Sequence, residues 1–195
     1  MSKRSVADGA CGSSFSPSSI PPSLMRYPIG PFTLPDHEVA AANRDTYVQN
    51  IGELPQKVAL IAQQLKVDGK LDVPYREGGW TARQVIHHLA DSHANAYVRH
   101  KRTLTEEHPT IAPYDEVSWA ELSDVTAAPI EASLDILRGL HLRWATLLAT
   151  CSVAQWERTA YHPGSGWTYR LDTLAANYSW HGLHHLAHLE IVLKS

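Results

Sequence analysis

Hydrophobic and polar positions from about residue 27 onward recur at the spacing of helices rather than of strands. The pattern predicts four long helices, with approximate bounds 36–66, 82–106, 130–150 and 171–194. In the third, one face carries a run of large side chains at helical spacing, namely Leu134, Leu137, His141, Trp144 and Leu148. No run of alternating strands accompanies them, so the sequence predicts an all-α fold.

Local signals set the ends of the first two helices. Asp36 is the expected N-cap of the first helix, and Pro55 predicts a kink or break inside it. The second helix is expected to begin after Gly78-Gly79-Trp80 with Thr81 as its N-cap, and to end before Pro109.

Two connections carry further structure. A short helical turn is predicted near residues 118–122, and residues 162–166 (His-Pro-Gly-Ser-Gly) form a turn that a short hairpin can flank. We therefore predict a four-helix bundle with a short loop helix and a minor hairpin, an architecture whose core often holds metal sites.

The first 25 residues differ in composition from the rest. They are rich in Ser, Pro and Gly, and their few large apolar residues cannot offset the entropy of ordering the segment. The segment also lacks the apolar region of a secretory signal. We predict a disordered extension over residues 1–25, or a misassigned start with Met25 as the better initiator, followed by one domain over residues 26–195.

Charge and motif content exclude several functions. A net charge of −3 without a Lys/Arg cluster gives no surface for nucleic acid, and no apolar run reaches the ~18 residues of a membrane span. Cys11 and Cys151 lie far apart, which favours a reducing cytoplasm over a disulfide framework. The chain has no G-x-S-x-G, C-x-x-C or phosphate-binding Gly loop.

Histidine is the unusual residue, with 12 copies. On the last helix four histidines share one stripe with apolar side chains, and the stripe comprises Leu174, Tyr178, His181, His184, His185, His188 and Val192. A stripe of this kind is not typical of a solvated surface. Histidines four residues apart can reach one ion, and the spacing is satisfied equally by the pair His181 and His185 and by the pair His184 and His188.

A catalytic zinc site needs a third protein ligand, and the second helix offers His88. His88 shares a face with Asp91, Ser92, Asn95 and Arg99. This face is either the solvated side of the helix or the lining of a polar cavity, in which Asp91 could orient an imidazole or act as acid/base.

The remaining histidines have no partner at the sequence spacing of a metal-ligand pair. His141 is expected to be a core histidine, and His162 either lines a site entrance or is exposed. No role is predicted for His37, His93, His100 and His108, and His87 points away from the His88 face.

Five motifs, in order along the chain, resemble the YfiT-type branch of the DinB superfamily. They are Tyr27–Gly30 (YPIG), Pro74–Thr81 (PYREGGWT), Arg83–His93 (RQVIHHLADSH), Pro113–Glu116 (PYDE) and Trp180–His188 (WHGLHHLAH). The similarity covers nearly everything from Tyr27 onward. The only departures are the N-terminal extension and individual side chains around the motifs.

The resemblance implies a four-helix bundle that holds a metal through His88, His181 and His185, and it implies a homodimer. A second apolar patch on the last helix (Leu183, Leu186 and Leu193) would need burying somewhere, in agreement with self-association.

Family members are mostly described as metal-dependent hydrolases, and other relatives transfer low-molecular-weight thiols such as bacillithiol. We therefore expect a hydrolase with one divalent ion per chain, first Zn²⁺ with Ni or Fe as alternatives, acting on a small-molecule substrate at an open coordination position. The alternatives are a thiol S-transferase, for which Arg99 could bind an anionic thiol, and a non-catalytic metal-binding module closed by a fourth protein ligand.

Overall fold

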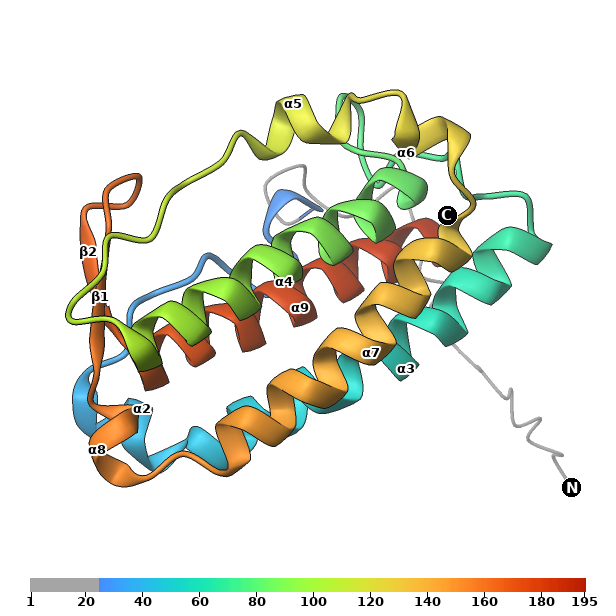
Figure 1. Ribbon diagram of the computed structural model, residues 1–195. Coiled ribbons are helices and arrows are strands. Elements are labelled where there is room, and N and C mark those ends of the chain that lie inside the picture. Colours follow the sequence, from blue (N-terminus) through green and yellow to red (C-terminus); the bar gives the residue numbers. More distant parts are fainter. Residues whose placement is uncertain (1–24) are drawn as a thin grey trace, which may run out of the picture.

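The computed structural model describes residues 25–195, and most of them are helical (Figure 1). The helices are α2 (His37–Ala42), α3 (Arg44–Val67), α4 (Ala82–Thr105), α5 (Glu116–Ala120), α6 (Asp124–Ala127), α7 (Ile130–Ala149), α8 (Val153–Trp156) and α9 (Leu171–Lys194). Strands β1 (Thr159–His162) and β2 (Trp167–Arg170) form an antiparallel hairpin. The predicted extension, residues 1–25, lies outside the described residues except for Met25.

Helices α3, α4, α7 and α9 form a four-helix bundle, so the predicted fold class is confirmed. Each of α3 and α4 packs against both α7 and α9, which places α3 diagonally opposite α4. Helices α3 and α9 run in one direction, and α4 and α7 run in the other (Figure 1). The connection from α4 to α7, which carries α5 and α6, crosses over the outer side of α4.

The predicted first helix is divided, but not at Pro55. Asp36 does cap α2, where its side chain accepts a hydrogen bond from the Val39 amide. The division comes at Asn43, whose side-chain amide donates to the carbonyl of Val39 and so closes the last turn of α2. Helix α3 continues through Pro55 without a break. The predicted break at Pro55 was therefore wrong.

The other predicted ends are close to those of the structure. Thr81 caps α4 in a reciprocal capping box with Gln84. The predicted turn near residue 118 is α5, and the hairpin pairs Thr159 with Arg170 and His162 with Trp167. Helices α6 and α8 were not predicted, because four residues are too few for a hydrophobic period to appear.

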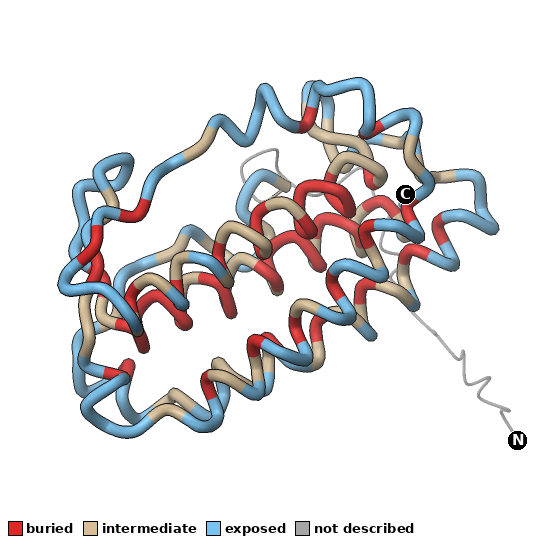
Figure 2. The backbone as a smooth tube through the Cα atoms, in the orientation of Figure 1, coloured by how far each residue is buried: buried red, intermediate tan, exposed pale blue. Residues whose placement is uncertain are grey.

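The core consists of two clusters of buried apolar side chains, and the buried positions follow the inward faces of the long helices (Figure 2). Leu186 belongs to the first cluster, and Leu183 and Leu193 pack against it. The chain itself thus covers much of the apolar patch that was expected to need a partner. This patch no longer supports self-association, and the homodimer stays a prediction of the resemblance.

A buried carboxylate fixes the start of α9. The Asp172 side chain is fully buried and forms ion pairs with Arg44 of α3 at 2.6 Å and Arg170 of β2 at 2.9 Å. Because β2 runs directly into α9, this cluster ties the hairpin and α3 to the helix that carries four histidines. Breaking a buried ion pair by removing one partner typically costs about 3–5 kcal/mol.

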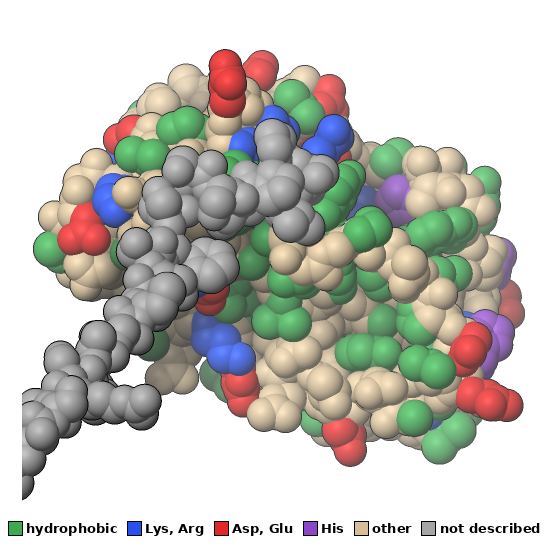
Figure 3. All heavy atoms as spheres, turned by 180° about the vertical axis from the view of Figure 1, so that it is seen from behind, with side chains coloured by type: hydrophobic (Ala, Val, Ile, Leu, Met, Phe, Trp, Pro, Cys, Tyr) green, Lys and Arg blue, Asp and Glu red, His purple; other side chains and the backbone are tan. Residues whose placement is uncertain are grey.

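The face opposite that of Figure 1 mixes hydrophobic, charged and neutral side chains, and histidine contributes only small areas to it (Figure 3). Of the described helices, none is long and apolar enough to span a membrane.

Candidate metal centre

One histidine from α4 and two from α9 meet at a single point. The ligand atoms of His88, His181 and His185 all lie within 4.8 Å of one another. The Nε2 atoms of His88 and His181 are 3.2 Å apart. Because α4 packs against α9, the His-x-x-x-His pair on one helix faces the single histidine on the other. These are the three residues that the family resemblance implies as ligands.

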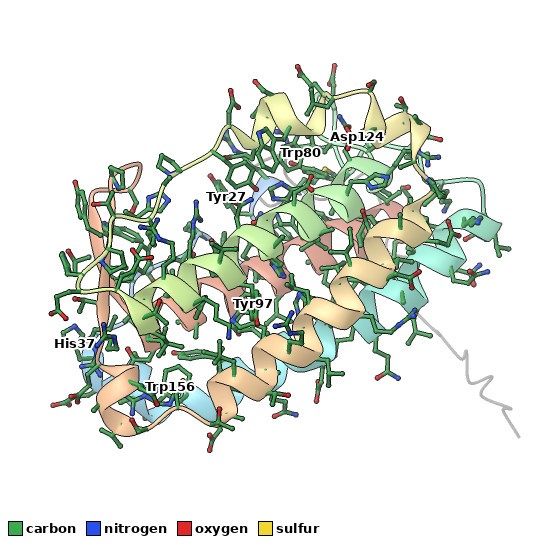
Figure 4. The ribbon with its side chains drawn as sticks, in the orientation of Figure 1. Tyr27, His37, Trp80, Tyr97, Asp124 and Trp156 are labelled. Carbon is green, nitrogen blue, oxygen red and sulfur yellow. The ribbon has the colours of Figure 1, made fainter. Side chains whose placement is uncertain are left out.

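The capped start of α4 positions Trp80 against this group of three histidines. The indole of Trp80 lies 4.7 Å from the His88 ring and 6.1 Å from the His185 ring, measured between centroids. Trp80 and Tyr27, both labelled in Figure 4, line the same cavity. Trp80 therefore limits where the imidazoles can lie.

Burial keeps these imidazoles neutral. Desolvation, with a smaller contribution from His184, lowers the pKa of His88 to about 4. Desolvation lowers the pKa of His181 and His185 well below the usual value, and electrostatic repulsion from the neighbouring histidines adds a smaller lowering. Neutral imidazole is the form that binds a metal ion, so the three rings are ready to act as ligands near pH 7.

A second group shares one of these histidines. The ligand atoms of His184, His185 and His188 also lie within 4.8 Å of one another. The Nδ1 atoms of His185 and His188 are 3.3 Å apart, and Nε2 of His188 is 3.1 Å from the carbonyl oxygen of Met25. The structure thus brings together both pairs that the helical spacing left open.

The first group lies in the wall of a cavity of about 750 Å³. Of the polar face predicted on α4, His88, Ser92 and Arg99 line this cavity, whereas Asp91 and Asn95 do not. Asp91 is partly buried, and burial and then the charge of Asp124 raise its pKa (Asp124 is labelled in Figure 4). The polar cavity on α4 is therefore present. Contrary to the prediction, Asp91 does not line it.

Other polar side chains line the same cavity as the histidines. Arg99 donates hydrogen bonds to the Tyr178 hydroxyl and to the carbonyl of Ala112. The buried hydroxyl of Tyr114 lies beside Ser92 but forms no hydrogen bond of normal geometry with the described residues. Desolvation raises the pKa of Tyr114 to about 12, so this hydroxyl remains protonated. His162 also lines the cavity, at the hairpin, in agreement with one of the two positions predicted for it.

Sequence reasoning missed the neighbour of His181. Nε2 of the fully buried His93 lies 3.0 Å from Nδ1 of His181, and its Nδ1 lies 2.8 Å from Nε2 of His141. His141 is a buried core histidine, as predicted, but its partner is another histidine. The available signal was that both lie on apolar stripes of helices that face each other in a bundle.

Two further histidines lie outside both groups, and a prediction was made only for His87. His87 does point away from the His88 face, and its Nδ1 lies 2.8 Å from the Ser133 hydroxyl of α7. His100 is fully buried and pairs with the carbonyl of Ala96 in its own helix.

Comparisons with known proteins show what this chain is similar to in sequence and fold. The family model of the DinB superfamily matches residues 52–189. The chain is 44% identical over 165 residues to "Putative metal-dependent hydrolase YfiT" of Bacillus subtilis (strain 168), covering 85% of this chain and 92% of that protein. A protein of Bacillus cereus (strain AH820), also described as a "Putative metal-dependent hydrolase", is 44% identical over 170 residues, covering 87% of this chain and 96% of that protein.

A solved structure is also similar. It is titled "YfiT from Bacillus subtilis is a probable metal-dependent hydrolase with an unusual four-helix bundle topology". It matches with a TM-score of 0.79 and 43% identity, and the match covers 87% of this chain and 95% of that one.

Proposed function

Because this chain belongs to the DinB superfamily, we propose that it is a metal-dependent hydrolase whose ion is held by His88, His181 and His185. The observation that carries the proposal is the convergence of three neutral imidazoles within 4.8 Å at the wall of a cavity. Three imidazole nitrogens are a donor set that suits a divalent transition metal, and we propose one Zn²⁺ per chain.

The number of ligands favours catalysis over a purely structural site. Structural zinc sites are usually closed by four protein ligands, whereas catalytic sites keep three and leave one position open. No fourth His, Cys, Asp or Glu of residues 25–195 joins the group of His88, His181 and His185. When bound, the ion would supply Lewis acidity and lower the pKa of bound water to about 7.

The chain's own residues would bind and orient the substrate. The cavity of about 750 Å³ has the size of a small-molecule site. The protonated Tyr114 hydroxyl can donate a hydrogen bond to an oxygen that gains negative charge, and Arg99 adds a fixed positive charge at the same wall. Trp80 packs against the rings of His88 and His185 and so covers one side of the site.

The hydrolase proposal is tested by turnover of a panel of small esters and amides with the Zn-loaded protein. We expect hydrolysis that needs no added thiol, stops on chelation and returns with Zn²⁺. His88→Ala should abolish it, whereas the control His37→Ala, on the exposed first turn of α2, should not.

Two results would reject the hydrolase. Product that forms only when a low-molecular-weight thiol is added would instead identify a thiol S-transferase. Hydrolysis that is unchanged by chelation and by His88→Ala would show that the reaction does not use this site.

A further inference from the structure

Each of the two proposed ligands on α9 is connected to a backbone carbonyl through other histidines. The first series runs from His181 through His93 and His141 to the carbonyl oxygen of Ile51, and we call it the Ile51 chain. Its nitrogen–nitrogen distances are 3.0 and 2.8 Å, and it ends with 2.5 Å between Nδ1 of His141 and the Ile51 oxygen. The second series runs from His185 through His188 to the Met25 oxygen, and we call it the Met25 chain.

Pro55 explains why the Ile51 oxygen is free to end the first chain. In α3 this carbonyl would normally accept from the backbone amide four residues later, but that residue is Pro55, which has no N–H. His141 of α7 supplies the missing donor. His141 therefore supplies the hydrogen bond that the Ile51 carbonyl lacks because residue 55 is a proline.

The Ile51 chain has only one possible direction. A carbonyl oxygen only accepts, so His141 must carry its proton on Nδ1, and in a neutral ring its Nε2 must accept. His93 then donates from Nδ1 and accepts at Nε2. His181 consequently donates from Nδ1, and its Nε2 is unprotonated and faces Nε2 of His88 at 3.2 Å.

Neutral rings are expected throughout the Ile51 chain. His93 and His141 are fully buried, and within residues 25–195 no hydrogen bond connects either of them to a carboxylate. An isolated buried charge is costly, so the neutral form is favoured.

The Met25 chain also has only one possible direction. The Met25 oxygen requires the proton of His188 on Nε2, which leaves Nδ1 of His188 as an acceptor. The facing Nδ1 of His185, at 3.3 Å, must then donate. His185 thus also has its Nε2 unprotonated. Tyr75, whose ring stacks on His188 with 3.8 Å between centroids, keeps the His188 ring in this orientation.

We propose that His93, His141 and His188 are positioning residues that hold His181 and His185 in the Nδ1–H tautomer, so that both present Nε2 to the metal ion. This inference rests on the proposed metal centre, and it assigns His188 to the support of His185 rather than to a second ion. Hydrogen bonds to the other ring nitrogen commonly fix the tautomer and orientation of metal-ligating histidines. Here two independent chains give the same result on one helix.

The direct test is long-range ¹H–¹⁵N NMR of the histidine rings in the full-length, metal-free protein. We expect His93, His141, His181 and His185 to be protonated on Nδ1 and His188 on Nε2. An Nε2–H tautomer at His181 or His185 would overturn the proposal. This measurement needs no metal, so its result is separate from that of the hydrolase test.

A variant series tests whether the Ile51 chain acts at a distance. His141→Leu fills a similar volume but removes both hydrogen bonds, whereas His141→Gln keeps one donor and one acceptor. Removing the hydrogen-bond partner of a metal-ligating side chain typically lowers metal affinity about 10–100-fold. We expect His141→Leu to weaken Zn²⁺ binding about 10-fold in competition with a chelator and to mix the tautomers of His181. His141→Gln should retain most of the affinity.

Two further variants complete the series. Pro55→Ala restores a backbone donor that competes for the Ile51 oxygen, without removing any core side chain. It therefore tests the Ile51 chain even if His141→Leu does not fold. It should shift the His181 ring signals and weaken Zn²⁺ binding several-fold. The control His100→Leu removes a buried histidine of α4 that lies outside both chains, and it should leave the affinity unchanged.

Three results would contradict the proposal. These are unchanged His181 signals and affinity in both His141→Leu and Pro55→Ala, an equal loss of affinity in His100→Leu, and two bound Zn²⁺ per chain with His188 as a ligand. If the wild-type protein binds no Zn²⁺ while the tautomers are as expected, the metal centre fails and the two hydrogen-bond chains stand.

Discussion

At the scale of single residues, the ligand set was accessible from sequence and its surroundings were not. Histidines four apart on an apolar stripe indicate a shared ion, and family motifs implied His88, His181 and His185, whose ring nitrogens meet in the structure. The contact between His93 and His141 depends on how two helices face each other, which the periodicity of one helix does not contain. Asp91 shows the converse, because a shared helical face did not bring it to the cavity.

Tyr114 gives the residue-scale prediction for catalysis. Its hydroxyl is buried, protonated and without a normal hydrogen bond, so it is free to donate to an oxygen of the substrate. Removing one such donor typically lowers kcat by on the order of 10². We expect Tyr114→Phe to lower kcat for a reporter ester by that order while Zn²⁺ affinity is kept. A full kcat in Tyr114→Phe would show that the hydroxyl takes no part in the reaction.

At the scale of elements, the long helices were predictable because each one satisfies several local rules at once. Thr81 and Gln84 form the predicted start of α4, and α9 follows the turn of the hairpin. Of the predicted kink or break at Pro55, the break was wrong, because local rules treat a proline as a loss of one hydrogen bond. In the bundle, His141 of another helix takes the carbonyl that Pro55 leaves free.

The cap of α4 can be tested directly. The Thr81 hydroxyl accepts from the Gln84 amide at 3.2 Å, and loss of an N-cap costs about 1 kcal/mol. We expect Thr81→Ala to lower the free energy of unfolding by that amount in urea denaturation of the metal-free protein. Thr81→Ser keeps the oxygen and serves as the control. Equal stability of Thr81→Ala and the wild type would mean that α4 does not depend on this cap.

At the scale of the whole molecule, the bundle buries many histidines in one core, which couples its stability to pH. Burial lowers the pKa of His100 and of His141 to about 4 in the folded protein, against 6.5 for an ordinary histidine. The unfolded chain therefore binds more protons below pH 6.5, and stability falls as the pH falls from there towards 4. Each such group contributes about 2 kcal/mol to the loss at pH 5.

His100 isolates one of these contributions, because its hydrogen bond goes to Ala96 and its aromatic neighbours are Trp144 and Tyr178 rather than the proposed metal ligands. With chelator present, we expect the unfolding free energy of the wild type to drop steeply between pH 7 and pH 5. In His100→Leu the drop should be smaller by about 2 kcal/mol. The exposed His37→Gln should show the wild-type drop. A drop in His100→Leu as large as in the wild type would contradict the assignment.

The central claim, a single ion held by His88, His181 and His185, is tested most directly by metal content after equilibrium dialysis against Zn²⁺. Three proteins suffice: the wild type, His88→Ala, and His184→Ala from the alternative pair on α9. We predict one Zn²⁺ per chain in the wild type and in His184→Ala, and almost none in His88→Ala. One Zn²⁺ retained in His88→Ala, or lost only in His184→Ala, would contradict it.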